Sequence, residues 1–408
     1  MKQIPSPREF ERIQALPPYV FAEVNAMKDA ARAAGEDVID LGMGNPDLAP
    51  PDHVVDKLVE TVRNPRVHRY SASRGIRGLR RAVAGYYQRR FDVTLDPERE
   101  VIVALGSKEG FAHLATAITE PGDLVLVPDP SYPIHPYGFV LAGAGIRGVP
   151  VGPGRDFVTE LARALEAGAG RVKAVTVNFP ANPTAAVVGL EVLEAIVDLC
   201  RRHEVWILSD LAYAEIYFDV SPPPSILQVP GAKELAVEFT SLSKTYSMPG
   251  WRIGFAAGNP HLVATLTRIK SYLDYGAFTP IQVAATAALN GPQEYVDSVR
   301  AIYRRRRDTL VGGLQRAGWD VDPPVATMFV WARLPTAFQG AGSLAFAKEL
   351  LSEARVAVSP GAGFGPGGEG WVRISLVENE QRIRQACRNI RQFLDRSDIG
   401  VRTARGAA

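Results

Sequence analysis

The sequence has few of the features that mark secreted, membrane or nucleic-acid-binding proteins. Only two of its 408 residues are cysteines, Cys200 and Cys387, so a disulfide framework is excluded. Both thiols are expected to be reduced and inert. No apolar run reaches the length of a membrane span, and no signal-peptide pattern occurs. The 46 basic and 44 acidic side chains nearly cancel, which argues against nucleic acid or an anionic membrane as partner. These absences predict a soluble, cytoplasmic protein.

Two motifs that can indicate nucleic-acid or nucleotide binding lack the context that they need. The dense basic run Arg304–Arg307 lies within a helical pattern, Glu294–Gln315, so we expect a solvated face with ion pairs. The segment Gly363–Gly368 matches G-x-G-x-x-G, but a strand pattern follows it where a dinucleotide site requires a helix. It predicts a glycine-rich loop between strands.

The order of apolar runs predicts an α/β protein. Helical periodicity covers 19–34, 52–64 and 76–91, after a proline-rich arm at 1–18. From about residue 100, short apolar runs alternate with polar turns and helices. Because the runs are apolar almost throughout, both faces of the sheet must be covered, which is typical of parallel strands. The predicted strands are 38–41, 101–105, 124–127, 172–177, 205–208, 235–239 and 253–257.

The length and a change of pattern predict two domains. A chain of 408 residues exceeds the roughly 250–300 at which one core stops growing. After residue 290, strand patterns at 325–334, 356–359 and 371–376 stand between helices, which indicates a smaller α+β domain. We therefore expect an N-terminal arm and part of the small domain in 1–45, a large domain in 46–290, and the rest of the small domain in 291–408.

The most informative stretch is Thr240–Phe255, where a lysine follows a buried strand. An amine that is partly desolvated at a strand end loses its proton more easily than an ordinary lysine, with its pKa of roughly 10.4. Lys244 is then able to form a Schiff base with a carbonyl. The donors Ser241, Ser243 and Arg252 suit a phosphate dianion. Together they suggest pyridoxal 5′-phosphate (PLP) as cofactor.

Two other interpretations of this stretch remain open at this point. Ser241–Lys244 fits S-x-x-K, the acyl-enzyme motif of penicillin-binding proteins, but its partners S-D-N and K-T-G do not occur. The closest tripeptide is Ser209-Asp210-Leu211. A polar turn with a solvated lysine is the simpler alternative.

Further polar residues follow the predicted strands, at the edge where open α/β sheets bind ligands. Taken singly, each has a structural explanation as a helix cap, turn, core aromatic or ion-pair partner. As a set they supply a phosphate-binding helix start, a carboxylate for a pyridine nitrogen, hydrogen-bond donors, a stacking ring and a guanidinium for a carboxylate. The residues that follow strands are Ser107, Lys108, Tyr132, Asn182, Asp210 and Tyr213, and the guanidinium belongs to Arg373, which is flanked by strand residues.

With these motifs the chain resembles the fold-type I, aspartate-aminotransferase-like PLP enzymes of the class I aminotransferase family. The resemblance runs from Leu41–Asp47 to Val372–Ser375. It implies a large domain with a mostly parallel sheet between helices and a smaller α+β domain. It also implies that Lys244 forms the Schiff base and moves the proton. The implied cofactor contacts are Asp210 at the ring nitrogen, Tyr213 and Asn182 at the ring oxygen, Tyr132 on the ring face, and Ser107, Lys108, Ser241, Ser243 and Arg252 at the phosphate.

The same resemblance implies the substrate site and the assembly. Arg373 would bind the substrate α-carboxylate, aided by Asn182 and the backbone of Gly44. Tyr70 would reach the phosphate of a neighbouring subunit in a homodimer with shared active sites. The reaction would be ping-pong transfer of an amino group between an L-amino acid and a 2-oxo acid, with no metal.

Several runs are similar to the bacterial glutamate–pyruvate (alanine) aminotransferases of the AlaC type, among them Tyr70–Ile76 and Arg268–Tyr272. Diaminopimelate aminotransferases share many of these runs. Specificity for diaminopimelate, aspartate or aromatic amino acids therefore stays open, as does a β-lyase or decarboxylase. A PLP-sensing regulator would need a DNA-binding module before the cofactor fold, which here starts near residue 40. A dicarboxylate substrate would need a second cation, for which Arg69, Arg74 and Arg77 are candidates.

Overall fold

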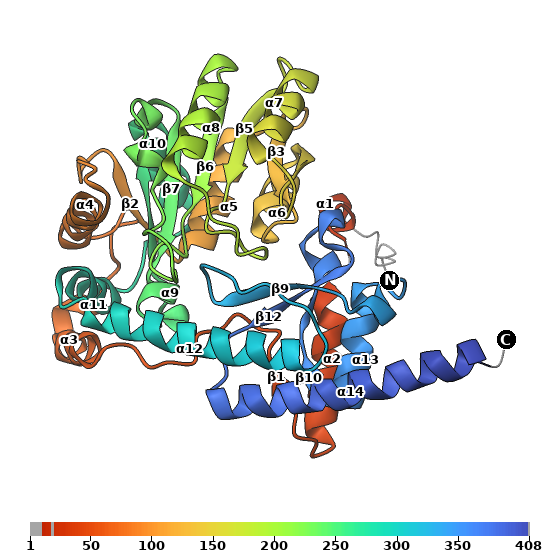
Figure 1. Ribbon diagram of the computed structural model, residues 1–408. Helices are drawn as coiled ribbons and strands as arrows, with labels where there is room; N and C mark the ends of the chain where they lie inside the picture. Colours follow the sequence, from red (N-terminus) through yellow and green to blue (C-terminus); the bar gives the residue numbers. More distant parts are fainter. Residues whose placement is uncertain (1–9, 18–19, 407–408) are drawn as a thin grey trace, which may run out of the picture.

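The computed structural model describes residues 10–17 and 20–406, so most of the predicted arm lies outside the described residues. Within that arm, 10–17 contain one short helix, α1 (Glu11–Gln14). A large sheet covered by helices and a smaller group of helices and short strands lie one above the other in Figure 1. The mixed α/β fold with a mostly parallel central sheet confirms the predicted fold class.

The large sheet has seven strands in the order β2-β8-β7-β6-β5-β3-β4. Six run parallel, and β8 is antiparallel to both of its neighbours. Two features were not predicted: the direction of β8 and the presence of β4, whose two glycines and mostly exposed residues leave no apolar run. The strands are β2 (Val101–Ala104), β3 (Leu124–Asp129), β4 (Gly145–Pro150), β5 (Val172–Val177), β6 (Trp206–Asp210), β7 (Ala236–Ser241) and β8 (Gly254–Gly258).

Helices cover both faces of this sheet, which explains why its strands are apolar throughout. Val101 and Val103 pack into the core on one face, while Ile102 between them packs into the core on the other. The first face carries α4 (Arg77–Phe91), α7 (Phe157–Ala167), α8 (Leu190–Arg202) and α11 (Thr279–Asn290), against which α3 (Asp52–Val62) packs. The second carries α5 (Ser107–Ile118), α6 (Ile134–Ala142) and α10 (Pro260–Leu273).

A separate core lies in the smaller part and combines both ends of the chain. Its antiparallel sheet is β11-β12-β9, and a parallel pair joins β1 to β10. Figure 1 shows α12 running from the large sheet to this part and α14 lying below it. The domain limits at residues 45 and 290 stay a prediction. The elements are α2 (Val20–Ala33), β1 (Ile39–Asp40), α12 (Glu294–Arg316), β9 (Phe329–Arg333), α13 (Ser343–Ala354), β10 (Val356–Ala357), β11 (Ser359–Pro360), β12 (Trp371–Ser375) and α14 (Glu380–Gly406).

The arginine run Arg304–Arg307 of α12 does not form the wholly solvated face that the sequence predicted. Arg304 and Arg305 do pair with acids near the surface. Arg306 and Arg307, however, are buried. Arg306 forms two hydrogen bonds of 2.7 Å to the carboxylate of Asp47. The prediction was wrong for these two because helix periodicity turns every third or fourth residue inward, whatever its charge.

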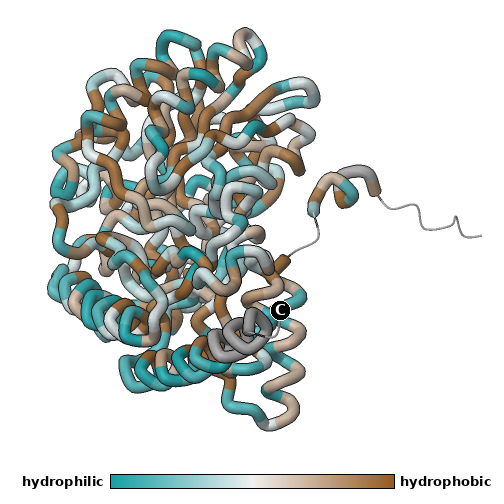
Figure 2. The backbone as a smooth tube through the Cα atoms, turned by 45° about the vertical axis from the view of Figure 1, so that its right-hand side comes forward, coloured by the Kyte–Doolittle hydropathy of each residue, from teal (hydrophilic) through white to brown (hydrophobic). Residues whose placement is uncertain are grey.

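The smaller predictions about thiols and loops hold. Burial raises the pKa of Cys200 in α8 to about 12 and that of Cys387 in α14 to about 11, so both thiols are inert. The segment Gly361–Gly368 is a loop of two short 3-10 turns that leads into β12. Hydrophobic segments gather inside the molecule, and the outer helices carry hydrophilic faces (Figure 2). Among the described residues, no helix is both long and apolar enough to cross a membrane.

Candidate active site

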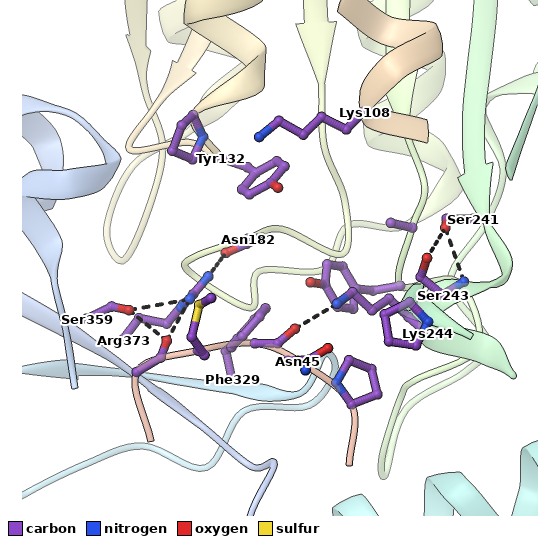
Figure 3. Close-up of a pocket in the computed structure, with 18 of the residues that line it drawn as sticks. Asn45, Lys108, Tyr132, Asn182, Ser241, Ser243, Lys244, Phe329, Ser359 and Arg373 are labelled. Atoms are coloured by element: carbon purple, nitrogen blue, oxygen red, sulfur yellow. Dashed lines mark hydrogen bonds between the residues drawn. The ribbon is translucent and has the colours of Figure 1, made fainter. Parts of the chain in front are cut away.

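A cavity of about 830 Å³ opens at the carboxyl ends of the large sheet, and the smaller part of the protein closes its other side. Open α/β sheets bind ligands at this edge. Apart from Tyr70, every site residue predicted from the sequence lines this cavity. These residues are Gly44, Ser107, Lys108, Tyr132, Asn182, Asp210, Tyr213, Ser241, Ser243, Lys244, Arg252 and Arg373. Figure 3 shows how several of them face one another across it.

Lys244 lies in the short helix α9 (Leu242–Thr245), directly after β7. Its amine donates a hydrogen bond of 2.7 Å to the carbonyl of Gly44, from the segment after β1 (Figure 3). Loss of hydration lowers the pKa of Lys244 to about 7, and the nearby charges of Arg373 and Arg252 add to this effect. At neutral pH a large share of this amine is therefore unprotonated and nucleophilic.

This pKa gives a direct test on the cofactor-free protein. Because only the free amine reacts, covalent labelling of Lys244 by an amine reagent should reach half its maximal rate near pH 7. Surface lysines should label with a midpoint near their ordinary value, roughly 10.4. Mass spectrometry of digested protein, labelled across a pH series, measures both profiles in one sample. A Lys244 midpoint at pH 10 would contradict the desolvated site.

Of the five phosphate-binding residues predicted from the sequence, four meet at one end of the cavity: Ser107, Ser241, Ser243 and Arg252. The Lys108 side chain extends instead toward Tyr132 (Figure 3). Helix α5 begins at Ser107, so the first backbone N–H groups of this helix point to this end. The hydroxyl of Ser241 donates to that of Ser243 at 2.8 Å. The guanidinium of Arg252 lies so close to Gly106 that a β-carbon there would be 2.4 Å from Nη2. The positive end of a helix, two hydroxyls and one cation suit a dianion.

Asp210 is the last residue of β6, and its carboxylate is held on two sides. One oxygen accepts from the backbone N–H of Ala212 at 3.2 Å. The other lies 2.9 Å from Nε2 of His135, a fully buried histidine at the start of α6. The backbone carbonyl of Asp210 accepts from Asn178 at 2.8 Å. These contacts fix the direction of the carboxylate, which is 7% exposed, before any ligand binds.

Tyr213, Asn182 and Tyr132 surround the space beside Asp210. Burial raises the pKa of Tyr213, so its phenol keeps its proton at neutral pH and is able to donate a hydrogen bond. The backbone N–H of Asn182 donates to the side chain of Asn178 at 2.9 Å, which places the Asn182 amide at the cavity. The ring of Tyr132 lies across the cavity from them, with the Lys108 ammonium 5.7 Å from its centre (Figure 3).

Arg373, in the middle of β12, faces the cavity from the small sheet. Its guanidinium donates to the Asn182 side chain at 2.8 Å and to the Gly42 carbonyl at 3.0 Å. The rings of Phe329 and Phe364 lie 4.1 and 4.7 Å from its central carbon. Aromatic faces and neutral acceptors hold the planar fork in place and leave it suited to a carboxylate.

Tyr70 is 86% exposed and does not line this cavity; its ring packs on Tyr275 at 4.5 Å. The predicted role of Tyr70 in a neighbouring subunit's site thus stays a prediction. Arg69, Arg74 and Arg77 do not line the cavity either. Arg74 and Arg77 both bind Glu98, through its carbonyl and its carboxylate respectively.

In the described part of the chain, one group of side chains has the spacing of metal ligands. Ligand atoms of Glu109, His113 and Asp274 lie within 4.8 Å of one another. The buried ammonium of Lys270, however, donates to Glu109 at 2.7 Å and to Asp274 at 2.9 Å. Since this cation already balances the two carboxylates, the group is explained as an ion-pair cluster. The absence of a metal stays a prediction.

Some residues of the site were missed by sequence reasoning. His135 and Asn178 hold Asp210 and Asn182 from behind, and Phe329 and Phe364 flank Arg373. The only available signal for His135 was a histidine three residues after Tyr132, at a helix start. The aromatic residues carried no signal, because an apolar residue in a strand or loop is normally part of the core.

The residues around the cavity fit PLP. One end of the cavity offers hydrogen-bond donors for a phosphate, and Lys244 supplies a nucleophilic amine. The fixed carboxylate of Asp210 suits a pyridinium nitrogen. The glycines at 106 and 254 let Arg252 and the start of α5 pack closely at the phosphate end, since β-carbons there would lie 2.4 Å from Arg252 and 2.8 Å from the Ser107 nitrogen. S-x-x-K acyl-enzyme chemistry is not supported, since the hydroxyl of Ser241 bonds to Ser243.

Comparison with known proteins gives a consistent result. The model of the family "Aminotransferase class I and II" matches residues 36–390. The chain is 58% identical to the "Putative aminotransferase AatC" of Rhizobium meliloti (strain 1021), over 96% of each chain. It is 55% identical to the "Glutamate-pyruvate aminotransferase AlaC" of Escherichia coli (strain K12), over 94% and 93%. It is 43% identical to the "LL-diaminopimelate aminotransferase" of Moorella thermoacetica (strain ATCC 39073 / JCM 9320), over 96% and 100%.

Solved structures agree. An aspartate aminotransferase double mutant from Thermus thermophilus superposes with a TM-score of 0.88 at 30% identity, over 95% of this chain and 100% of that one. Both the family model and these relatives cover far more than half of the chain. The chain therefore belongs to the class I and II aminotransferases, a family of PLP-dependent transaminases.

Proposed function

We propose that this protein is an alanine transaminase, which moves an amino group between alanine or glutamate and pyruvate or 2-oxoglutarate. The observation that carries the proposal is the pairing, within one cavity, of an amine with a pKa of about 7 and a held guanidinium. Lys244 provides the first and Arg373 the second. Similarity to a glutamate–pyruvate aminotransferase over nearly the whole chain supports the choice of substrates.

The proposed mechanism assigns each step that the protein performs to its own side chain. Arg373 binds the substrate α-carboxylate and thereby orients the amino group toward Lys244. The Lys244 amine, with its pKa near neutral, takes the proton from Cα in the first half-reaction. In the second half-reaction it gives a proton back to Cα. When bound, PLP supplies an aldehyde for the amino group and an electron-withdrawing ring. The proposed order is ping-pong, so the first 2-oxo acid leaves before the second binds.

Other residues hold the cofactor in this proposal. The Asp210 carboxylate would keep a proton on the ring nitrogen, and its contact with His135 fixes its direction. Tyr213 and Asn182 would donate to the ring oxygen, and Tyr132 would pack on the ring face. Ser107, Lys108, Ser241, Ser243 and Arg252 would bind the phosphate.

A homodimer with shared sites belongs to the same proposal. Large apolar side chains lie exposed near Tyr70, a pattern that in soluble proteins marks a contact surface. They are Tyr272, Leu273, Tyr275 and Phe278. On this surface Tyr70 would reach the phosphate of the neighbouring site. A cytoplasmic location remains a prediction, which cell fractionation would test.

The substrate panel is the decisive experiment for specificity. With 2-oxoglutarate as acceptor, alanine should give a kcat/KM at least about tenfold above aspartate, aromatic amino acids and LL-diaminopimelate. With pyruvate as acceptor, glutamate should be the best donor. Steady-state rates for each donor, with product amino acids measured by chromatography, check both statements.

A second candidate is an LL-diaminopimelate aminotransferase, because a relative with that name covers the chain at 43% identity. A higher kcat/KM for LL-diaminopimelate than for alanine in the panel would favour it and contradict the first proposal. Release of pyruvate or ammonia without any 2-oxo acid acceptor would instead indicate a β-lyase on this scaffold.

A further inference from the structure

The glycine-rich loop, residues Gly361–Gly368, contributes Phe364 to the cavity, but the proposed mechanism assigns no step to the loop. It consists of two 3-10 turns, Gly361–Phe364 and Pro366–Gly368, and connects β11 to β12 in the small sheet. Its base is tied to α13, where the Ser343 hydroxyl accepts from the Ala362 N–H at 3.1 Å. Its tip extends to the carboxyl end of β3 in the large sheet.

Two hydrogen bonds join the tip of this loop to the end of β3. The backbone N–H of Gly367 donates to the carboxylate of Asp129, the last residue of β3, at 2.9 Å. The backbone N–H of Ser131 donates to the carbonyl of Phe364 at 2.8 Å. Tyr132, which flanks the cofactor space, is the next residue in the chain. The loop thus bridges the two sides of the cavity.

Glycine is required where the loop touches β3. Gly365 has φ of +121°, a conformation that other residues rarely adopt, and a β-carbon there would lie 2.5 Å from Oδ1 of Asp129. A β-carbon at Gly367 would lie 2.8 Å from the Asp129 carbonyl oxygen and 3.0 Å from Oδ1. Gly365 and Gly367 therefore allow close approach to a carboxylate, which is the opposite of what a phosphate site needs.

The loop also carries one of the rings that hold Arg373. Phe364 is 4% exposed, lines the cavity, and has its ring centre 4.7 Å from the guanidinium carbon. The ring of Phe21, from α2, meets it edge to face at 5.2 Å. A shift of the loop would therefore move Phe364 and change the setting of Arg373. Asp129 itself does not line the cavity, so any effect it has on substrate acts through the loop.

We propose that Asp129 is a positioning residue for substrate binding: by holding Gly367, it sets Phe364 and Arg373 opposite the Tyr132 side of the cavity. The inference rests on the proposed function, in which Arg373 binds the α-carboxylate. Removal of the Asp129 contact weakens binding of every substrate that carries this carboxylate, whatever its side chain. The chemical step and cofactor binding, which use Lys244 and Asp210, do not depend on it.

The first test compares substitutions of Asp129 in the PLP-loaded enzyme. Asp129→Ala should raise KM for both the amino acid and the 2-oxo acid about threefold to tenfold, with kcat within about twofold of wild type. PLP affinity should not change. Asp129→Asn should restore KM, because the amide oxygen still accepts from Gly367. Asp123→Ala, at the other end of β3, is the matched control; its carboxylate caps the turn at Glu120.

The second test reaches the same contact from the loop side. Gly367→Ala should raise KM like Asp129→Ala, because a β-carbon at this position would lie 2.8 Å from the Asp129 carbonyl oxygen and would push the loop away from β3. Gly340→Ala, where a β-carbon meets nothing within 4 Å, is its control. Hydrogen exchange, which needs no activity, should show faster exchange of the Ser131 amide in both variants.

Unchanged KM values in Asp129→Ala would overturn the proposal, as would a fall in kcat alone. Unchanged exchange at Ser131 would also contradict it. Failure of the proposed function is distinguishable, because wild-type enzyme would then not transaminate or would not bind PLP, while the exchange result would stand unaffected.

Discussion

Replacing Lys244 with alanine is expected to abolish the visible absorbance that PLP gains when a lysine binds it, and to lower turnover by about 10⁴-fold or more. No neighbouring lysine is able to replace this amine. Lys28 also lines the cavity, but its ammonium donates to Asp40 at 2.7 Å and to Asn25 at 3.1 Å. Lys108 lies across the cavity, above the ring of Tyr132. Absorbance spectra and single-turnover rates measure the two effects.

Two further variants separate the chemistry of Lys244 from its structural role. Lys244→Arg keeps a cation in the cavity, but a guanidinium stays protonated and offers no free amine, so this variant should be nearly as inactive as Lys244→Ala. Lys57→Ala removes a surface lysine paired with Glu60 and should leave turnover unchanged. Normal turnover in Lys244→Ala would remove this lysine from the mechanism, and a colourless wild-type protein that does not bind added PLP would remove the cofactor.

The sequence predicted much of the site because of one rule of parallel sheets. Residues at the carboxyl ends of parallel strands meet at the same edge, however far apart they are in the chain. Asn182, Asp210 and Lys244 lie at or just after the ends of β5, β6 and β7, so their convergence could be inferred from the parallel pattern, and the structure shows that these strands are neighbours. Arg373 belongs to another sheet, and its place in the cavity could be inferred only from resemblance to a family.

Other parts of the site could not be predicted, because they depend on tertiary contacts that leave no local pattern. The contact of Gly44 with Lys244 joins residues 200 positions apart. The antiparallel direction of β8 is not visible in an apolar run, since such runs look alike in either direction. Arg306 is buried because Asp47, far away in sequence, provides a partner for it. Gly44 and Asp47, the partners of Lys244 and Arg306, lie in other segments of the chain, so the local sequence around the two cations does not show these contacts.

Replacing Asp210 with alanine should lower turnover by about 10²–10⁴-fold while the protein stays folded. In this variant a bound pyridine ring would lack the anion that keeps its nitrogen protonated, and the ring would withdraw electrons less well. His135, which lies 2.9 Å from this carboxylate, would lose its partner as well. Steady-state kinetics, with thermal unfolding measured in parallel, tests the prediction.

The comparison with Asp210→Asn identifies the cause of that loss. Asparagine keeps the size of the side chain and can still accept from the Ala212 N–H, so the loop after β6 should stay in place. It lacks the negative charge, however, and should therefore be impaired almost as severely as alanine. Asp210→Glu keeps the charge and should retain more activity than either. If asparagine instead restored turnover, Asp210 would act by holding the loop, and its role at the ring nitrogen would have to be abandoned.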